Sequence, residues 1–520
     1  MRIERTKNAT RNMVFGTALK LYQIILPFFM RTIMVYTIGV EYLGLNSLFI
    51  SILQMLNLAE LGVGSAMVFS MYKPIVSEDR IVICALMNLY KWYYRIIGGI
   101  ILIIGIVLTP FIPDLINGDI PSDINVYILY LLNLFATVLT YWLFAYKNSI
   151  LQAHQRTDIV SKVTICTDTF KYIFQISALF LFRNYYLYVI AILLSQIFNN
   201  IFTAIVSQKL YPQYKAVGKL TKESIQEINS KIKDLFTAKL GGTIVNSADT
   251  IVISAFLGLT VLAVYQNYYY IMISVVGFIT ILLNSCTAGI GNSILTETEE
   301  KNYKDFKNFA FMEIWVAGIC VCCFLNLYQP FMTLWMGEDN LLNFGCVILI
   351  CIYFYLYITN QFMCTYKDAA GIWHEDRFRP LIGAIFNLIL NLLLVRFIGI
   401  FAIILSTVLS YIFIIIPWLI HNLFTVLFKR ASIEFVKKYI YYTFVILIAA
   451  LFTGFLSSKI REITILSLII RFSISFIGSN IVFLVLMGHG EEFKNALYIV
   501  DKISKGKISS LLYIHKNRDY

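Results

Sequence analysis

The chain has 520 residues, of which 59% are hydrophobic and only 14% are charged, and its formal net charge is +12. Apolar runs of about 20 residues, the length needed to cross a bilayer, recur from end to end and exclude a soluble globular protein. The positive charge lies mainly between these runs, where it attracts anionic lipid headgroups, so it does not indicate nucleic-acid binding.

The apolar runs predict an all-α polytopic membrane protein with about 14 transmembrane helices. The first run has no small-residue cleavage site after it, so we expect it to be retained and not removed as a signal peptide. Two connections are very short, at residues 183–185 and 396–399. The predicted spans are residues 13–38, 43–71, 92–113, 124–146, 160–182, 184–207, 237–258, 262–289, 308–330, 341–364, 380–396, 399–424, 439–457 and 464–487.

The basic residues predict the orientation of these spans. Most of the 42 Lys and Arg residues lie in the N-terminal segment, in the connections that follow even-numbered spans, and in the C-terminal tail. The opposite connections carry only Arg183, Arg396, Lys459 and Arg461. Because short cytoplasmic loops hold an excess of Lys and Arg, we expect both termini to be cytoplasmic.

The first span carries two cations within its apolar run. Lys20 and Arg31 are 11 residues apart, which is three helical turns, so they project from one face of the helix. A charge at this depth costs about 3 kcal/mol unless it faces protein or water. Arg31 is therefore the first candidate for a functional site, with Tyr22 and Gln23 between the two cations.

The second span carries four polar residues at spacings of about 8, 3 and 3, namely Asn46, Gln54, Asn57 and Glu60. Such spacings place the four side chains on roughly one face, as in the wall of a water-filled cavity. Alternatively, Glu60 lies near the cytoplasmic end of the span and is simply hydrated.

Residues 221–236, TKESIQEINSKIKDLF, lie in the longest connection near the middle of the chain. The apolar residues recur at helical spacing with lysines between them, which predicts an amphipathic helix on the inner membrane surface. This segment would join two halves of the protein.

The two halves share a sequence pattern. The first reads RTIMVYTIGVEYLG from Arg31 and ends its hairpin with GVGS at residues 62–65; the second reads DTIVISAFLGLTVLAVY from Asp249 and ends with GIGN at residues 289–292. A repeat separated by six spans keeps its orientation, so the pattern predicts two parallel six-helix lobes around a central cavity, with two additional C-terminal helices.

A second pair of segments supports this repeat. The connection QAHQRTD at residues 152–158 matches AGIWHEDRFRP at residues 370–380, each four spans into its own half. The predicted parts of the chain are then an N-lobe (1–207), a cytoplasmic amphipathic linker (208–236), a C-lobe (237–424), the last two spans (425–487) and a basic cytoplasmic tail (488–520).

Opposite charges stand at matching positions of the two halves. Arg31 and Asp249 either face each other across the cavity, or pair to hold the lobes closed. In the fifth span Asp168 and Lys171 form an i, i+3 pair that can neutralise itself. Its repeat partner, the eleventh span, has asparagines at 387 and 391. The remaining cations within spans are Arg95 and Arg471.

The first hairpin resembles a known family. The resemblance is carried by Arg31, Thr32, Ile33, Gly39, Glu41, Tyr42, Gly44, Leu45, Glu60, Leu61, Gly62 and Gly64, and in the second half by Asp249, Gly258 and Tyr265. These residues resemble the Wzx-type, polysaccharide-exporting branch of the multidrug/oligosaccharidyl-lipid/polysaccharide (MOP) exporter superfamily. A branch that moves a peptidoglycan precursor has an aspartate after the first arginine, where this chain has Thr32, which argues against that cargo.

The resemblance implies a flippase of the bacterial cytoplasmic membrane. Its cargo would be an oligosaccharide linked to undecaprenyl diphosphate, moved by alternating access for capsule, exopolysaccharide or O-antigen synthesis. Arg31 would bind the diphosphate, because its planar fork suits phosphate oxygens, and Lys20 is the second choice. The whole set of candidate substrate contacts is Arg31, Lys20, Gln23, Asn46, Gln54, Asn57, Asp249 and Lys171. Besides the glycolipid and membrane lipids, other polysaccharide assembly proteins are conceivable partners.

The energy source is left open by the sequence. There is no G-x-x-x-x-G-K-[ST] loop, so nucleotide hydrolysis has no support. Proton or sodium coupling through Asp249, Glu60 or Glu313 is one alternative, and consumption of the product outside is another. No metal site, cofactor or disulfide framework is predicted, because eight of the nine cysteines lie in the predicted apolar spans and Cys84 stands alone in its connection.

Two rival functions are considered. A drug/cation antiporter of the same superfamily would favour acidic groups in the cavity, whereas the charges within the spans are mostly basic. A membrane polysaccharide polymerase or ligase would be expected to use a sizeable external loop, and every external connection is short. His154 and His374 lie in cytoplasmic connections without a catalytic constellation, so we expect both to be solvated loop histidines. The protein is therefore expected to be a transporter and not an enzyme.

Overall fold

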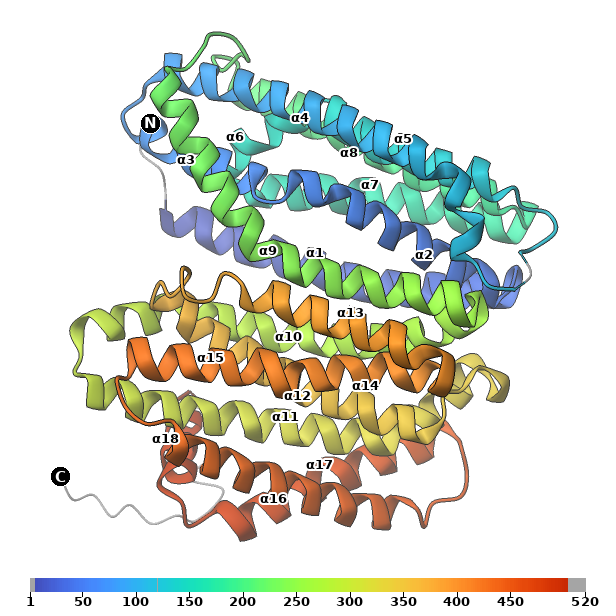
Figure 1. Cartoon of the computed structure of the whole chain (residues 1–520), viewed down its shortest axis with the longest axis vertical. Helices are drawn as coiled ribbons and strands as arrows, with labels where there is room; N and C mark the ends of the chain where they lie inside the picture. The colour runs from blue at the N-terminus through green and yellow to red at the C-terminus, as the bar shows by residue number, and fades with distance from the viewer. Residues whose placement is uncertain (1–4, 119, 504–520) are drawn as a thin grey trace. The chain divides into compact units, whose positions relative to one another are not determined.

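The structure is a computed structural model that describes residues 5–118 and 120–503 (Figure 1). Within these ranges the chain is built from helices joined by short turns, and no strand occurs. The helices are α1 (Arg5–Thr37), α2 (Val40–Leu56), α3 (Val63–Val76), α4 (Arg80–Leu108), α5 (Val126–Trp142), α6 (Asn148–Ala153), α7 (Thr157–Ser177), α8 (Tyr185–Leu210), α9 (Lys222–Leu257), α10 (Leu259–Thr296), α11 (Glu299–Met336), α12 (Phe344–Ala369), α13 (Arg379–Ile398), α14 (Ile400–Ser410), α15 (Ile416–Asn422), α16 (Ile433–Ser457), α17 (Ile465–Met487) and α18 (Glu491–Ile503).

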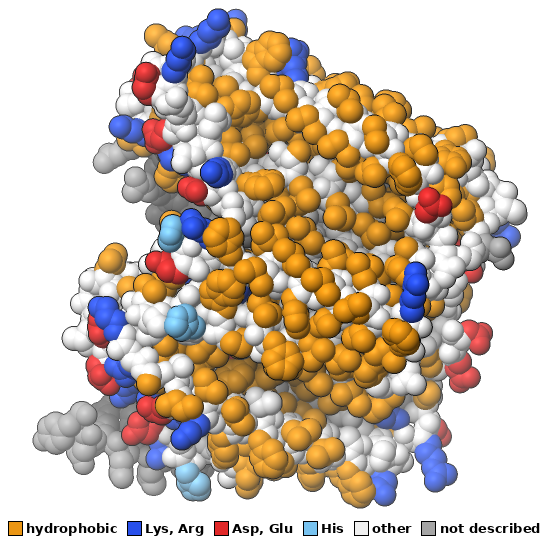
Figure 2. Space-filling view, in the orientation of Figure 1, with side chains coloured by type: hydrophobic (Ala, Val, Ile, Leu, Met, Phe, Trp, Pro, Cys, Tyr) orange, Lys and Arg blue, Asp and Glu red, His pale blue; other side chains and the backbone are white. Residues whose placement is uncertain are grey.

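The predicted all-α polytopic fold is confirmed. Among the described residues, 13 helices are long and apolar enough to cross a membrane, and the bent pair α5–α6 makes up to 14. Figure 2 shows hydrophobic side chains along the lengths of the helices and charged side chains mainly near their ends. The two very short connections also lie where they were predicted, with positive φ angles at Arg183 and Gly399.

Contacts group the described chain into two compact units. Unit 1 holds residues 5–267 and 380–403, and unit 2 holds residues 268–379 and 404–503. The boundaries therefore fall within α10, at the start of α13 and within α14. This grouping differs from the two lobes expected from the repeat, but it does not test the repeat, so the predicted division stays a prediction.

The second predicted span, residues 43–71, is broken. It consists of α2, a 3₁₀ turn at Asn57–Glu60 and α3. Gly62 stands at the break with a φ of +89°, and a Cβ atom added there would lie 2.7 Å from the Cβ atom of Leu235. The break therefore depends on a residue without a side chain, because the chain turns through the left-handed region while α9 packs closely against it.

The amphipathic segment does not form a helix of its own. It is the first part of α9, which begins after the N-cap Thr221 and continues without interruption into the next span. Ile228 is buried, and the backbone of Ile232 and Phe236 lies against Gly62. The prediction of a helix is correct. The apolar face was expected to lie on the membrane surface, whereas in the structure it packs against the α2–α3 break.

In unit 2, α11 is the central helix. It packs against α12, α16, α17 and α18. Its buried Phe306 is in ring contact with Phe424, Phe428 and Phe435 at centroid distances of 6.2, 4.8 and 5.1 Å. These aromatic contacts join the start of α11 to the segments around α15 and α16.

Candidate functional site

Arg31 lies on α1 and contacts the first turns of α10 within unit 1. Its Nη1 atom donates to the Oδ1 atom of Asn267 at 3.2 Å and to the backbone carbonyl of Gln266 at 3.5 Å. The Asn267 side chain is fully buried. These two partners are uncharged amide oxygens, which orient the guanidinium group.

A second polar group lies between α9 and α13. Asn391 donates from Nδ2 to Oδ1 of Asp249 at 2.6 Å and to Oδ1 of Asn387 at 3.2 Å. Asp249 is 7% exposed, and both asparagines are fully buried. Asn391 of the eleventh span thus links Asn387 to Asp249, a contact that the sequence analysis did not predict.

Gln266 connects the two groups. Its carbonyl oxygen accepts from Arg31, while its side-chain Nε2 donates to Oγ1 of Thr250 at 3.0 Å, next to Asp249. Arg31 and Asp249 therefore lie in one contact unit, in a polar region built from α1, α9, α10 and α13. We call this region the Arg31 cluster; it comprises Arg31, Asp249, Thr250, Gln266, Asn267, Asn387 and Asn391.

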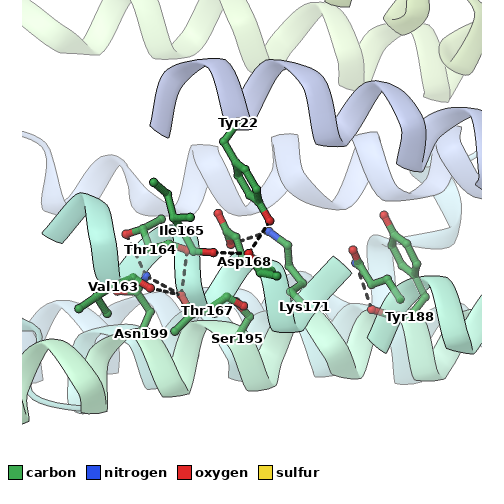
Figure 3. Close-up of polar contacts among 12 residues, drawn as sticks. Tyr22, Val163, Thr164, Ile165, Thr167, Asp168, Lys171, Tyr188, Ser195 and Asn199 are labelled. Atoms are coloured by element: carbon green, nitrogen blue, oxygen red, sulfur yellow. Dashed lines mark hydrogen bonds and ion pairs between the residues drawn. The ribbon is translucent and has the colours of Figure 1, made fainter. Parts of the chain in front are cut away.

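Lys171 lies in a different polar region, between α1 and α7 (Figure 3). Its Nζ atom forms the predicted ion pair with Asp168 at 2.7 Å and lies 4.3 Å from the ring centroid of Tyr172. Tyr22 of α1 points toward this pair, and its hydroxyl group is 2.7 Å from Oγ1 of Thr169. Because Asp168 already neutralises Lys171, this lysine is a weak candidate for binding phosphate.

The α2–α3 break contains two of the four polar residues of the second span, Asn57 and Glu60. Tyr94 donates to Oε1 of Glu60 at 3.1 Å, and Tyr90 donates to the Tyr94 hydroxyl at 2.6 Å. Tyr141 donates to Oδ1 of Asn57 at 3.1 Å. Sequence reasoning missed these tyrosines, although Tyr90 and Tyr94 at i and i+4 share one face of α4.

The other candidates do not join one site. Lys20, Gln23 and Gln54 have exposed side chains, and Asn46 is half-buried. Glu313 is in unit 2, where it is 6% exposed and Oε1 accepts from Thr359 at 3.4 Å. The predicted set thus separates into the Arg31 cluster, the Lys171 pair, the α2–α3 break, the buried Glu313 and several exposed positions.

The matching connections 152–158 and 370–380 each contain a buried aspartate bound by an arginine. In unit 2, Arg379 donates from Nε and Nη2 to the two oxygens of Asp376 at 2.6 and 2.9 Å, and both side chains are buried. In unit 1, Arg156 Nε donates to Asp158 at 2.9 Å, and this hydrogen bond raises the pKa of Arg156. The repeat had indicated the segments but not this shared ion pair.

His154 is next to the unit 1 pair and is 7% exposed. Its ring stacks on Tyr211 at a centroid distance of 4.3 Å, and Nε2 has no hydrogen-bond partner among the described residues. Burial lowers the pKa of His154 to about 4. It is therefore a neutral packing residue and not the solvated loop histidine that was expected.

The comparisons with solved structures define the class of fold. A structure of the lipid II flippase MurJ in an inward closed conformation matches with a TM-score of 0.67 and 16% identity, over 91% of this chain and 98% of that chain. An inward-facing multidrug resistance MATE family transporter of the MOP superfamily matches with a TM-score of 0.61 and 15% identity, over 78% and 97% of the two chains. A mutant of the Vibrio cholerae MATE transporter VcmN gives 0.52 and 13%, over 82% and 99%. At these identities the matches show a shared fold, which is that of flippases and transporters.

The family follows from the sequence itself. The model of the polysaccharide biosynthesis protein family matches residues 9–285, more than half of the chain, and the chain belongs to this family. No curated relative matches. The family match confirms the resemblance to the polysaccharide-exporting branch of the MOP superfamily.

Proposed function

We propose that the protein is a flippase that moves an oligosaccharide linked to undecaprenyl diphosphate across the bacterial cytoplasmic membrane, with both termini in the cytoplasm. The observation that carries this proposal is Arg31, a cation within an apolar helix whose guanidinium is held by the amide oxygens of Asn267 and Gln266. Membership of a polysaccharide biosynthesis family supports the same cargo.

The chemistry of the cargo explains why such a cluster is useful. A diphosphate has to cross about 30 Å of hydrocarbon, which requires cationic groups along the route. An arginine offers several donors in a planar fork that matches phosphate oxygens. In this proposal Arg31 binds the diphosphate during alternating access, and Asp249 competes with it for the guanidinium group. Coupling to protons or sodium through Asp249, Glu60 or Glu313 remains a prediction.

An antiporter for organic cations is the main alternative. It is favoured by the fold shared with MATE transporters and by the buried carboxylate of Asp249. A polymerase or ligase is less well supported, since the solved structures with this fold are transporters or flippases. We therefore propose a transporter without enzymatic activity.

The test is transbilayer movement of lipid-linked sugars in vesicles that contain the purified protein. We expect the intact protein to move undecaprenyl diphosphate that carries a sugar, and Arg31→Ala to slow this movement about 10- to 100-fold, the effect of losing charge-assisted hydrogen bonds. Arg31→Lys should keep part of the activity, because it keeps the charge and loses the fork.

Arg95→Ala is the matched control, because Arg95 is also within a span but is exposed and stacks on Trp92 at 5.5 Å. It should transport like the intact protein. Movement of an organic cation without movement of any glycolipid would establish the antiporter instead, and full activity of Arg31→Ala would refute the phosphate role.

A further inference from the structure

Unit 2 contains a half-open cavity of about 300 Å³ that the proposed function has not used. This volume is at the lower end of small-molecule sites, which range from about 300 to 1,000 Å³. The cavity lies between the C-terminal part of α10, the first turns of α11 and the end of α12. Part of its wall is the GIGN segment, residues 289–292, which ends the hairpin of the second half.

The wall is made by matching faces of two helices. On α10, Cys286, Gly289 and Ser293 follow at spacings of 3 and 4; on α11, Asn302 and Asp305 are followed by an aromatic ring at 309. Such spacings place side chains on one helix face. The cavity is therefore lined by one continuous face of each helix.

The corresponding glycine region of the first half has no such space. A Cβ atom added at Gly62, the GVGS residue that matches Gly289, would lie 2.7 Å from the Cβ atom of Leu235 and 3.0 Å from the backbone oxygen of Ile232. A Cβ atom added at Gly289 would meet nothing within 4 Å. Helix α9 fills this position in the first half, whereas the second half leaves an opening.

The polar side of the cavity offers hydrogen-bond donors and acceptors. Ser293 donates to Oδ1 of Asn302 at 2.8 Å, which links α10 to α11 and fixes the orientation of the amide group. Asp305 forms no hydrogen bond or ion pair with any described residue, so both oxygens are available as acceptors. The opposite side is aromatic, with Phe309 and the buried Tyr366.

These groups select among ligands by charge. A phosphate would be repelled by the carboxylate of Asp305. A cation would gain little, because Lys304 stands beside Asp305 on α11 and reduces the negative potential, while Lys301 is paired with Glu297 at 2.7 Å. An uncharged polyhydroxylated ring satisfies both sides, since its hydroxyl groups can donate to Asp305 and accept from Asn302 while its C–H face packs on an aromatic ring.

We propose that this cavity is a saccharide subsite that holds one sugar ring of the lipid-linked cargo. The proposal rests on the proposed flippase function and adds a residue-level position for the glycan in unit 2. Asp305 and Asn302 provide the hydroxyl contacts, and Phe309 and Tyr366 provide the apolar wall.

Cys286 supplies a direct binding test that does not depend on transport. The purified full-length chain is treated with N-ethylmaleimide, and modification of Cys286 is followed by mass spectrometry, with the exposed Cys166 in unit 1 as internal reference. The added probes are undecaprenyl diphosphate carrying glucose, galactose or N-acetylglucosamine, the same lipid without sugar, and tetraphenylphosphonium.

At a ligand concentration about ten times its Kd, a sugar-bearing lipid should slow modification of Cys286 about tenfold, because only unoccupied protein reacts. Cys166 should be unaffected. Protection by the sugar-free lipid or by the cation to the same extent, or protection by none of the three glycolipids, would overturn the proposal.

Substitution at Gly289 tests the same cavity during transport. Gly289→Leu should fill the space and slow glycolipid movement about tenfold or more, while Gly289→Ala, which adds only a Cβ atom, should have a smaller effect. Gly99→Leu is the matched control, since Gly99 in α4 also has nothing within 4 Å of an added Cβ atom. Asp305→Asn should weaken sugar protection of Cys286, because an amide has one acceptor oxygen instead of two.

The two proposals fail separately. If the intact protein moves glycolipids and Gly289→Leu is as active as Gly99→Leu, the subsite is refuted and the flippase function stands. If the intact protein moves no glycolipid but moves the cation, the flippase function is refuted, and with it the subsite.

Discussion

Arg31 and Asp376 are both charged residues with buried partners, but only Arg31 could be identified as a candidate from the sequence. The sequence indicated Arg31 because a charge in an apolar run needs an explanation. It gave no comparable signal for Asp376, whose connection contains several other charged residues. Arg379, which binds Asp376, is only three residues away. The pair is also held by Asn360, 19 residues before Arg379, and by Asn422, 46 residues after Asp376. Such distant contacts have no local pattern.

Removing one side of this buried pair should destabilise the protein. We expect Arg379→Met to lower the free energy of unfolding by about 3 kcal/mol, because a buried carboxylate is left with poorer compensation. The measurement is thermal unfolding of the purified protein in detergent. Lys429→Met removes the exposed ion pair with Glu299 and should cost at most about 1 kcal/mol; equal losses in both variants would contradict the interpretation.

His154 predicts a pH dependence of stability. Its pKa is about 4 in the folded protein and about 6.5 in an unfolded chain, so the unfolded state binds the additional proton between these values. Stability should therefore fall as the pH drops from about 6.5 to 4. Comparing melting temperatures at pH 7.5 and 5, His154→Phe should show a smaller decrease than the intact protein. His374→Phe, at an exposed position, should leave the decrease unchanged.

At the scale of helices, hydropathy predicted the spans well because each has to cover the bilayer with apolar residues. The same criterion could not find the α2–α3 break, since residues on both sides are equally apolar. Nor could it show that the amphipathic segment continues into α9, because both a surface helix and a helix packed on protein have one apolar face. Only the packing against Gly62 distinguishes these alternatives.

The α2–α3 break can be tested by adding one methyl group. Gly62→Ala should destabilise the protein by about 1–2 kcal/mol or more, because alanine is unfavourable at positive φ and its Cβ atom would meet Leu235 at 2.7 Å. Gly99→Ala, in an uninterrupted helix with open space, should be neutral or slightly stabilising. Both are compared by thermal unfolding, and similar melting temperatures would mean that the break tolerates a side chain.

At the scale of the whole chain, the predicted orientation remains to be measured. A cysteine introduced at Asn184 should react with a membrane-impermeant maleimide in intact cells, whereas one at Glu375 should react only after the membrane is opened. The prediction follows from the excess of Lys and Arg on the side that includes residue 375. Both variants are made in a background without Cys166, the exposed native thiol. The reverse pattern would place both termini outside.

The hydrogen bond between Asn391 and Asp249 joins two residues that are synthesised at different times. The two residues are 142 positions apart, and chains grow at about 5–20 residues per second, so Asp249 is made about 7–28 s before Asn391 exists. During that interval the inserted part of unit 1 lacks α13, and the nascent chain has to keep an acidic residue in or near the bilayer without its later partner. Insertion factors that shield polar side chains would therefore matter most between the emergence of α9 and that of α13.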